Sequence, residues 1–179
     1  MNNILFIITG SIAASRCKEI ITLLRNKEVK ISCILTKEAT KYIKILDIKK
    51  LLKNRIFTDE DEKKNKMLHI NLSRDNDIIV VCPATANSIA KFANGYGDNL
   101  ASNTLLASNK KVLLVPAMNS FMWHNKINQK NVRLLKDNGH EFIGPKVGNL
   151  KCGEYGLGRI DNSRNIVNKI LSRLENINL

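Results

Sequence analysis

Five short apolar runs, separated by segments with helical spacing, constrain this chain more than any other feature of its sequence. The runs predict buried strands over residues 3–9, 29–36, 77–83, 111–116 and 140–144. Because the apolar residues are consecutive rather than alternating, both faces of each strand are expected to be covered. Strands of this kind, alternating with helices, predict a three-layer α/β fold whose sheet is doubly wound and mainly parallel.

The segments between these runs predict helices and one loop. Apolar spacings of three and four residues favour helices over residues 11–26, 37–45, 47–54, 84–95, 98–108, 122–139 and 164–176. Residues 58–66, TDEDEKKNK, carry many charges and few apolar side chains, which favours a solvated loop or a mobile flap. No repeat and no linker interrupts the pattern, so a single domain over residues 1–179 is expected.

Composition narrows the class of protein. The 179 residues are 44% hydrophobic and 25% charged, which is an ordinary balance for a globular domain with a sizeable core. No segment approaches the roughly 18 consecutive apolar residues of a membrane span. The N-terminus MNNILFIITG lacks the basic region of a signal peptide, so we expect a cytoplasmic protein.

The net charge of +13 and the pI near 9.7 raise nucleic-acid or membrane binding as alternatives. The lysines are scattered, however, and aromatic residues make up only 5% of the chain, too few for base-stacking platforms. We therefore expect the basic surface to attract an anionic small molecule, with no nucleic-acid or membrane partner. Nucleic-acid binding remains an alternative that rests on charge alone.

The cysteines divide into two kinds. Cys17, Cys33 and Cys82 lie in apolar segments and are expected to be small buried hydrophobic side chains. Cys152 stands in the glycine-rich loop LKCGEYGLG, where a thiol has no core to fill. No pair has C-x-x-C spacing and no Cys/His cluster has zinc spacing, so no metal site is predicted.

Small polar residues follow four of the five predicted strands. Gly10 and Ser11 stand in the turn TGSIAAS, where a tight turn leads into a helix N-terminus that suits a phosphate. Thr36 ends the second strand, PATANS (83–88) follows the third, and PAMNSFMW (116–123) follows the fourth. A plain turn or a helix cap would explain the turns at Gly10 and Asn119, whereas a helix cap explains only one of Pro83, Thr85, Asn87 and Ser88. Because ligands of doubly wound folds bind at these strand ends, together they predict a flat, polar-edged cofactor with a phosphate tail.

Three side chains suggest proton-handling chemistry at the same edge. His69 lies just before the third strand, Asn119 lies in PAMNSFMW, and Cys152 lies in the late glycine-rich loop. A lone histidine is more often structural, and His124 and His140, which have no such company, are interpreted as surface or helix-end residues.

These stretches together resemble the flavin-containing cysteine decarboxylase family, especially its bacterial members in coenzyme A biosynthesis. The resemblance runs from Gly10 to about Arg159 and is strongest in PATANSIAKFANGYGDNL (83–100), PAMNSFMW and LKCGEYGLGR (150–159). It implies a Rossmann-like flavoprotein with FMN bound between the subunits of a homotrimer, which some members assemble into a homododecamer. Many bacterial relatives carry this domain fused to a C-terminal synthetase, so either a separate phosphopantothenoylcysteine synthetase is an expected partner or these residues are the decarboxylase part alone.

The resemblance also implies roles for individual residues. It implies FMN contacts at Gly10, Ser11, Ile12, Ala13, Thr36, Thr85, Ala86, Asn87, Ser88 and Ala117. His69 matches the catalytic histidine, Asn119 matches the asparagine that holds the substrate carboxylate, and Cys152 matches the cysteine that completes the reaction. Further substrate contacts are implied for Met122, Arg74 and Lys151.

The implied reaction is decarboxylation of 4′-phosphopantothenoylcysteine to 4′-phosphopantetheine. Oxidation of the carbon bearing sulfur, with FMN as electron carrier, gives a C=S group that accepts the electrons as CO₂ leaves. Re-reduction then follows, with Cys152 as proton donor in a loop that closes as a lid. Met122 and Trp123 are expected to form apolar walls that exclude water.

Alternatives within the fold are less consistent with the residues. Peptide-modifying relatives stop at the oxidised enethiol and lack the loop cysteine, whereas Cys152 is present here. A flavin prenyltransferase shares the early glycine–serine turn, but PAMNSFMW and the cysteine loop argue against it. A non-catalytic regulatory subunit would lose His69 or Asn119 or gain a long acidic tail.

Overall fold

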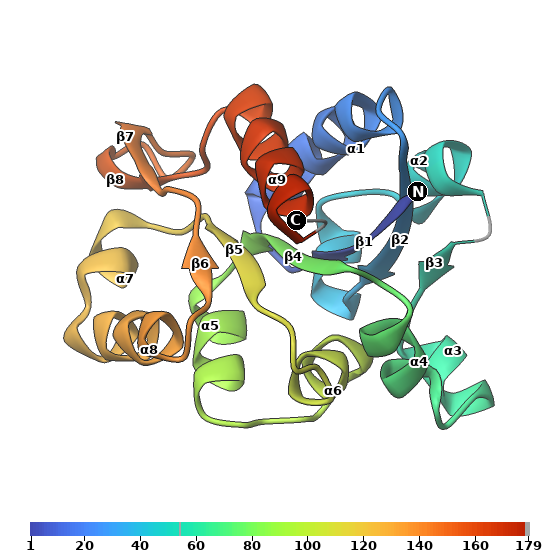
Figure 1. Cartoon of the computed structure of the whole chain (residues 1–179). Helices are drawn as coiled ribbons and strands as arrows, with labels where there is room; N and C mark the ends of the chain where they lie inside the picture. The colour runs from blue at the N-terminus through green and yellow to red at the C-terminus, as the bar shows by residue number, and fades with distance from the viewer. Residues whose placement is uncertain (54, 178–179) are drawn as a thin grey trace.

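The computed structural model describes residues 1–53 and 55–177, and its centre is a six-stranded parallel sheet (Figure 1). The strands are β1 (Asn2–Ile8), β2 (Val29–Leu35), β3 (Ile56–Phe57), β4 (Ile78–Ala84), β5 (Val112–Pro116) and β6 (Glu141–Phe142), in the order β3-β2-β1-β4-β5-β6. This order confirms the predicted doubly wound fold. The direction of winding reverses between β1 and β4, and their carboxyl ends mark the usual ligand crevice.

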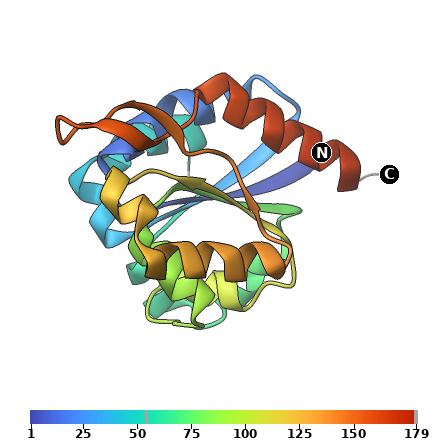
Figure 2. The same ribbon diagram turned by 90° about the vertical axis from the view of Figure 1, so that its left-hand side faces the viewer.

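Helices cover both faces of the sheet, as Figure 2 shows. One face carries α1 (Cys17–Arg25), α2 (Ile45–Leu52) and α9 (Ser163–Ile177). The other carries α4 (Leu68–Arg74), α5 (Ala86–Ala93), α6 (Leu100–Leu106), α7 (Ser120–His124) and α8 (Lys126–Asp137). None of these helices, in the part of the chain that the structure describes, is long and apolar enough to cross a bilayer.

Strand β1 shows why the runs are apolar at every position. Ile4, Phe6 and Ile8 pack into the cluster with α1 and α9, whereas Leu5 and Ile7 pack into the cluster with α4 to α8. All five side chains are fully buried. Burial of each contributes about 1.5–3 kcal/mol, so a strand between two helical layers is stabilised from both sides.

Several predicted helices differ from the observed ones. The segment 11–26 begins as a 3-10 helix (Ile12–Arg16) before α1, and 37–45 contains only a 3-10 helix (Lys37–Lys41). The predicted helix over 122–139 is broken at Asn125, whose extended backbone ends α7 and whose side chain caps α8. The predicted helix over 47–54 corresponds to α2, and its last residue, Asn54, lies outside the described residues.

The prediction of a loop over residues 58–66 is wrong, because helix α3 (Asp59–Lys64) forms there. The Asp61 carboxylate accepts hydrogen bonds from the backbone N–H and the hydroxyl of Thr58, at 2.8 and 2.9 Å. Acidic residues in the first turn also interact favourably with the helix dipole. The Thr-x-x-Asp spacing was therefore a start signal, stronger than the high charge that favoured a loop.

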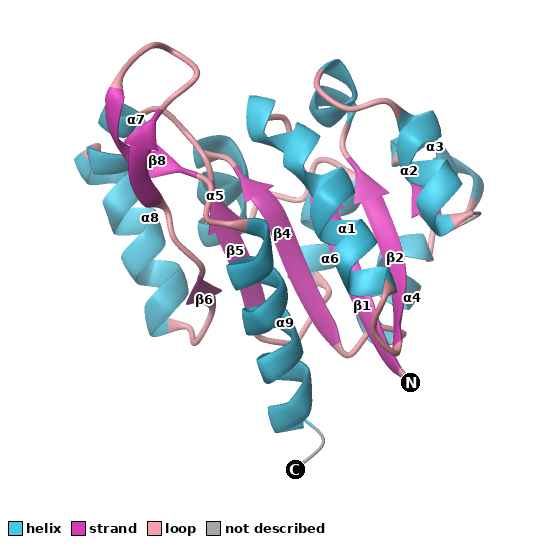
Figure 3. Cartoon of the chain, turned by 90° about the horizontal axis from the view of Figure 1, so that it is seen from above, coloured by secondary structure: helices cyan, strands magenta, loops and turns pink. Residues whose placement is uncertain are grey.

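A small antiparallel hairpin was not predicted. It consists of β7 (Lys146–Asn149) and β8 (Tyr155–Arg159), and residues 150–154 form its tip. Figure 3 shows the tip beyond the sheet, at the edge toward which the strand arrows point. The hairpin therefore carries the glycine-rich loop to the predicted ligand crevice.

Candidate active site

A cavity of about 1050 Å³ opens at the carboxyl ends of the strands. Its size is at the upper end of the usual range for small-molecule sites, enough for a cofactor and a substrate together. The lining includes all the predicted FMN contacts: Gly10, Ser11, Ile12, Ala13, Thr36, Thr85, Ala86, Asn87, Ser88 and Ala117. The substrate and proton-donor candidates Asn119, Met122, Lys151 and Cys152 also line it. His69 and Arg74 do not.

The turn after β1 packs closely against Glu38, in the 3-10 helix Lys37–Lys41, and lines the cavity. A Cβ on Gly10 would stand 2.5 Å from the Cβ of Glu38, so only glycine fits where the chain bends. Ser11 accepts a hydrogen bond from the N–H of Ala13 at 3.3 Å and caps the helix that begins at the cavity. A helix N-terminus facing a cavity favours an anion, so this wall fits the phosphate of a flavin mononucleotide.

The threonines at the next strand ends have structural roles besides lining the cavity. The Thr36 hydroxyl accepts from the N–H of Ala39 at 3.3 Å, and the Thr85 hydroxyl accepts from the N–H of Ser88 at 3.1 Å. The Ser88 hydroxyl in turn donates to the Thr85 carbonyl. These hydrogen bonds order the two turns, whereas the side chain of Asn87 is exposed at the cavity.

The amide of Asn119 has an orientation set by the helix that follows it. Its Oδ1 accepts from the N–H groups of Phe121, at 2.8 Å, and Met122, at 3.3 Å, and thereby caps α7. Because the oxygen is used in this way, the Nδ2 group is left to face the hairpin. It donates to Cys152 Sγ at 3.5 Å and to a carboxylate oxygen of Glu154. Asn119 therefore presents a donor, as the binding of a carboxylate requires.

Glu154 is a site residue that the sequence analysis missed. The Cys152 thiol donates to Glu154 Oε2 at 3.6 Å, and the same oxygen accepts from Asn119. We call Cys152, Glu154 and Asn119 the lid cluster. A carboxylate two residues after the loop cysteine was the available signal, but nothing in the sequence showed that the two side chains converge on one amide.

Two glycines hold the hairpin against the turn that carries Asn119. A Cβ on Gly158 would overlap the backbone carbonyl of Met118, and a Cβ on Gly156 would stand 2.7 Å from Ser120 Oγ. The Gly158 carbonyl accepts from the Met118 N–H at 3.0 Å. The GLG sequence thus allows close backbone packing, which places the hairpin tip over the cavity.

His69 lies in a second cluster away from the cavity. Its Nδ1 stands 2.7 Å from Glu62 Oε1, an ion-pair distance whose angles do not make a hydrogen bond, and both side chains are largely buried. The Asn103 amide donates to both oxygens of Glu62 at 3.4 Å. We call His69, Glu62 and Asn103 the helix cluster, because it joins α4, α3 and α6.

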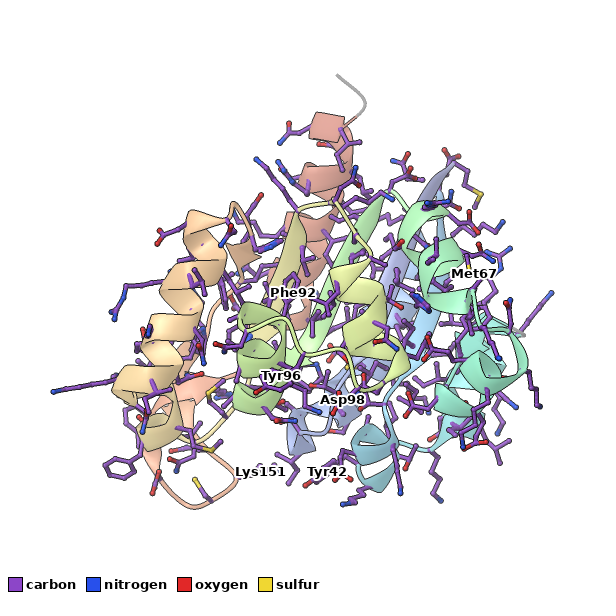
Figure 4. All side chains as sticks on the ribbon, turned by 90° about the horizontal axis from the view of Figure 1, so that it is seen from below. Tyr42, Met67, Phe92, Tyr96, Asp98 and Lys151 are labelled. Atoms are coloured by element: carbon purple, nitrogen blue, oxygen red, sulfur yellow. The ribbon has the colours of Figure 1, made fainter. Side chains whose placement is uncertain are left out.

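The position of α4 explains why the predicted residues separate. Figure 4 shows Tyr42 and Lys151, which line the cavity, at one edge of the molecule, whereas Met67, directly before α4, lies well away from them. Arg74 is exposed at the far end of α4, and its carbonyl accepts from Lys110 Nζ at 3.1 Å, just before β5 begins. Arg74 is therefore at the amino-end edge of the sheet, which argues against a substrate contact in the same subunit.

The expectation that Trp123 forms a wall of the site is wrong. Its side chain is only 8% exposed and packs in the core cluster with α8, and its carbonyl accepts from Asn128 and Gln129. Met122, by contrast, is exposed and lines the cavity. The tryptophan anchors the short helix α7, so it supports the site from behind.

The cysteines divide as predicted. Cys17, Cys33 and Cys82 are buried, and Cys152 is exposed. Burial raises the pKa of the Cys17 and Cys33 thiols well above the ordinary value. Only Cys152 combines exposure with a position at the cavity.

Comparison with known proteins agrees with this geometry. The model of the family described as Flavoprotein matches residues 1–175. The chain belongs to the flavoprotein family. A family member from Streptococcus mutans, named "Probable phosphopantothenoylcysteine decarboxylase", is 32% identical over 96% of this chain and 98% of its own length. The bifunctional coenzyme A biosynthesis protein CoaBC of Bacillus subtilis is 34% identical over 92% of this chain. This chain spans about two fifths (41%) of that relative.

Solved flavoprotein structures show the same arrangement. A PPC decarboxylase variant complexed with pantothenoylaminoethenethiol superposes with a TM-score of 0.89 at 28% identity, covering 97% of this chain and 98% of the other. The FMN binding protein AtHal3 superposes with a TM-score of 0.86 at 29% identity, covering 98% and 97%.

Proposed function

We propose that this chain is a phosphopantothenoylcysteine decarboxylase of coenzyme A biosynthesis, which converts 4′-phosphopantothenoylcysteine to 4′-phosphopantetheine with FMN as cofactor. The observation that carries the proposal is the contact between Asn119 and Cys152 at the cavity. A carboxylate-binding amide beside an exposed thiol is what a decarboxylase with a final protonation step requires. The names of the S. mutans relative and of the PPC decarboxylase structure support the same substrate.

The cavity fits FMN by its shape and by its chemistry. The bend at Gly10 and the helix N-terminus after it suit the phosphate, and Ala117 leaves the backbone open to a flat ring. When bound, FMN supplies the reversible two-electron oxidation that creates an electron sink next to the substrate carboxylate. Lys37, Lys151 and Arg159 also line the cavity, and their charge favours an anionic substrate.

The residues around the substrate have separable tasks. Asn119 orients the carboxylate through Nδ2, and the structure contains a carboxylate, that of Glu154, on this very group. Positioning of this kind contributes several kcal/mol, on the order of what effective-molarity measurements give. Met122 covers the reacting carbons, and Cys152 gives a proton to the carbon that has lost CO₂.

His69 acts, in this proposal, on the substrate of a neighbouring subunit of a homotrimer. The helix cluster does not reach the cavity of its own chain, and exposed apolar side chains support an assembly. They gather on α7, on the start of α8 and on the adjoining hairpin: Phe121, Met122, Ile127, Val147 and Tyr155, each 48–78% exposed. Apolar surface of this extent marks an interaction site. Trimers could assemble further into a dodecamer.

The wider setting is also proposed. Residues 1–179 act as one FMN-binding domain in the cytoplasm. We infer that a synthetase supplies the substrate, because the B. subtilis relative is a bifunctional protein of coenzyme A biosynthesis.

The first experiment is to purify the chain, record its absorbance spectrum and incubate it with 4′-phosphopantothenoylcysteine. We expect flavin bands and a product lighter than the substrate by the mass of CO₂. Cys152→Ser is expected to release a product lighter by two further hydrogens, because re-reduction lacks its proton donor. Cys82→Ala, in the buried core, is the matched control and should give the fully reduced product. Protein that cannot be loaded with FMN would contradict the proposal.

A complementation experiment tests the shared site. His69→Asn and Asn119→Ala are each expected to be inactive alone. If subunits exchange on mixing, one cavity in a mixed trimer receives an intact His69 and an intact Asn119, and activity returns. Light scattering measures the assembly. Mixed trimers that form without any regained activity would show that both residues must come from one chain.

A further inference from the structure

The lid cluster contains a carboxylate for which the proposed reaction has as yet no role. Glu154 is half-buried, two residues after Cys152, at the tip of the hairpin. Its Oε2 accepts from the Cys152 thiol at 3.6 Å and from the Asn119 amide. In the described part of the chain it is the one carboxylate that is hydrogen-bonded to this sulfur.

The hydrogen bonds of Asn119 make Glu154 a competitor of the substrate. Its Oδ1 is committed to the cap of α7, and its amide nitrogen carries two N–H groups. One of these is directed at Cys152 Sγ and the other at Glu154. A substrate carboxylate bound at Asn119 must therefore displace the carboxylate of Glu154. When CO₂ leaves, the amide is free again and Glu154 can return beside the sulfur.

The stoichiometry of the reaction calls for an acid at that moment. Loss of CO₂ replaces a bond from carbon to carboxylate by a bond from carbon to hydrogen, so each turnover takes up one proton. In the last step the enethiol would gain, at the carbon bearing sulfur, the hydride that FMN supplies when it is bound. It gains a proton from Cys152 at the neighbouring carbon, which leaves Cys152 as a thiolate. The thiolate must be protonated before the next turnover.

We propose that Glu154 is the proton relay of Cys152 and that it exchanges with the substrate carboxylate at the Asn119 amide. After Cys152 has given its proton, Glu154 takes up a proton from solvent at the exposed hairpin tip and passes it to Sγ, which restores the thiol and the carboxylate. The existing thiol-to-carboxylate hydrogen bond is the path, used in reverse. Glu154 does not itself act on the substrate; it supports Cys152, which does. This inference rests on the proposed function.

The decisive variant is Glu154→Gln, which retains the size of the side chain and loses the proton. With FMN-loaded protein, we expect CO₂ release within about threefold of wild type in the first turnover, and a roughly tenfold rise in the ratio of oxidised enethiol to reduced product. Glu154→Asp, which retains a carboxyl group, should give an intermediate ratio. Glu141→Gln, which makes the same chemical change at a carboxylate that pairs with Arg173 and does not line the cavity, is the matched control and should keep the wild-type ratio.

A second measurement needs neither substrate nor turnover. Because the Cys152 thiol donates to the Glu154 carboxylate, Glu154→Gln should change the rate of alkylation of Cys152 by iodoacetamide about threefold or more. The other three cysteines are buried, and mass spectrometry identifies the labelled residue. The control variant Glu141→Gln should react at the wild-type rate.

The outcomes separate the inference from the proposed function. Wild-type protein that releases no CO₂ would overturn the proposed function. If Glu154→Gln releases CO₂ at the wild-type rate and its ratio of oxidised enethiol to reduced product is unchanged, the inference alone is overturned. Lower CO₂ release in Glu154→Gln with an unchanged product ratio would also overturn the inference, since it would indicate that Glu154 only holds the hairpin tip in place. Equal alkylation rates would show that the two side chains do not interact in solution.

Discussion

The lid cluster and the helix cluster share a glutamate and an asparagine but differ in their third member, Cys152 or His69, and in their surroundings. Each joins a proton-handling side chain to a glutamate and an asparagine amide. The lid cluster lies on an exposed hairpin at the cavity, held to the turn before α7 by backbone packing at Gly158. The helix cluster is largely buried among α3, α4 and α6, at the β3 edge of the sheet (Figure 1).

The difference shows how the fold distributes its chemistry. The cluster on the hairpin lies at an exposed tip, where local opening costs least, whereas the helix cluster is held between three helices. A residue that must exchange with the substrate is better placed in the lid cluster on the exposed hairpin. A base that must be held in one orientation is better placed in the helix cluster. Because the two clusters lie at opposite edges of one chain, the proposed function requires a site shared between subunits to join them.

The largest effect is expected from a substitution at the centre of the lid cluster. Asn119→Asp replaces the amide donor with a carboxylate that repels both Glu154 and the substrate carboxylate. Product formation is expected to fall about 10²–10³-fold, comparable to the loss of an oxyanion donor. Steady-state kinetics with FMN-loaded protein measures it. Asn125→Asp is the matched control, because Asn125 caps α8 in the same way and does not line the cavity. Equal losses in both variants would show that only helix capping was affected.

The next largest effect is expected from a substitution in the helix cluster. Glu62→Gln removes the charge beside His69 Nδ1, so the imidazole loses the group that holds its orientation. We expect kcat to fall about 10–100-fold with little change in KM, a part of the usual contribution of a general base. Glu60→Gln is the control, since its carboxylate pairs with the exposed Lys63. A kcat within about twofold of wild type would remove the helix cluster from the mechanism.

A smaller effect is expected where the hairpin meets the turn. Gly158→Ala places a methyl group against the Met118 carbonyl, so the hairpin must shift and Cys152 with it. The unfolding free energy should fall by about 1–3 kcal/mol, and the oxidised fraction of the product should rise. Gly139→Ala, at φ +83° after α8, should cost about 1–2 kcal/mol through backbone strain alone. A raised oxidised fraction in Gly139→Ala as well would attribute the effect to stability.

The smallest effect separates stability from catalysis when pH changes. His140 lies outside both clusters, and desolvation by burial lowers its pKa. Its Nδ1 accepts from the Val112 N–H at 3.1 Å, which requires a neutral ring. The unfolded state therefore binds the proton first, and stability should be lost as the pH falls through the unfolded pKa, about 6.5, toward the folded one. Urea unfolding across this range should show a smaller loss in His140→Asn. If the unfolding free energy of His140→Asn depends on pH as steeply as that of the wild type, the loss of stability comes from another titrating group.

Parts of the site followed from the sequence because local chemistry is decisive there. Gly10 marks a bend that admits no Cβ, and Ser11 and Thr85 cap helices at strand ends, so their positions at the cavity could be predicted. The hairpin could not be predicted in the same way. Its strands are short and rich in glycine, and its register depends on contact with Met118 rather than on its own pattern. Because the hairpin was not predicted, nothing in the sequence distinguished Glu154 from any other loop carboxylate.

The sequence by itself determined the doubly wound sheet, the edge at which ligands bind and most residues of the cavity. Apolar runs and helix caps act over a few residues, so their patterns can be interpreted without coordinates. Only the tertiary structure decided which side chains meet. It placed Glu154 on Cys152 and Asn119, buried Trp123, and separated His69 from the cavity. These outcomes depend on contacts between segments far apart in the chain, where packing and hydrogen-bond geometry select one partner among many.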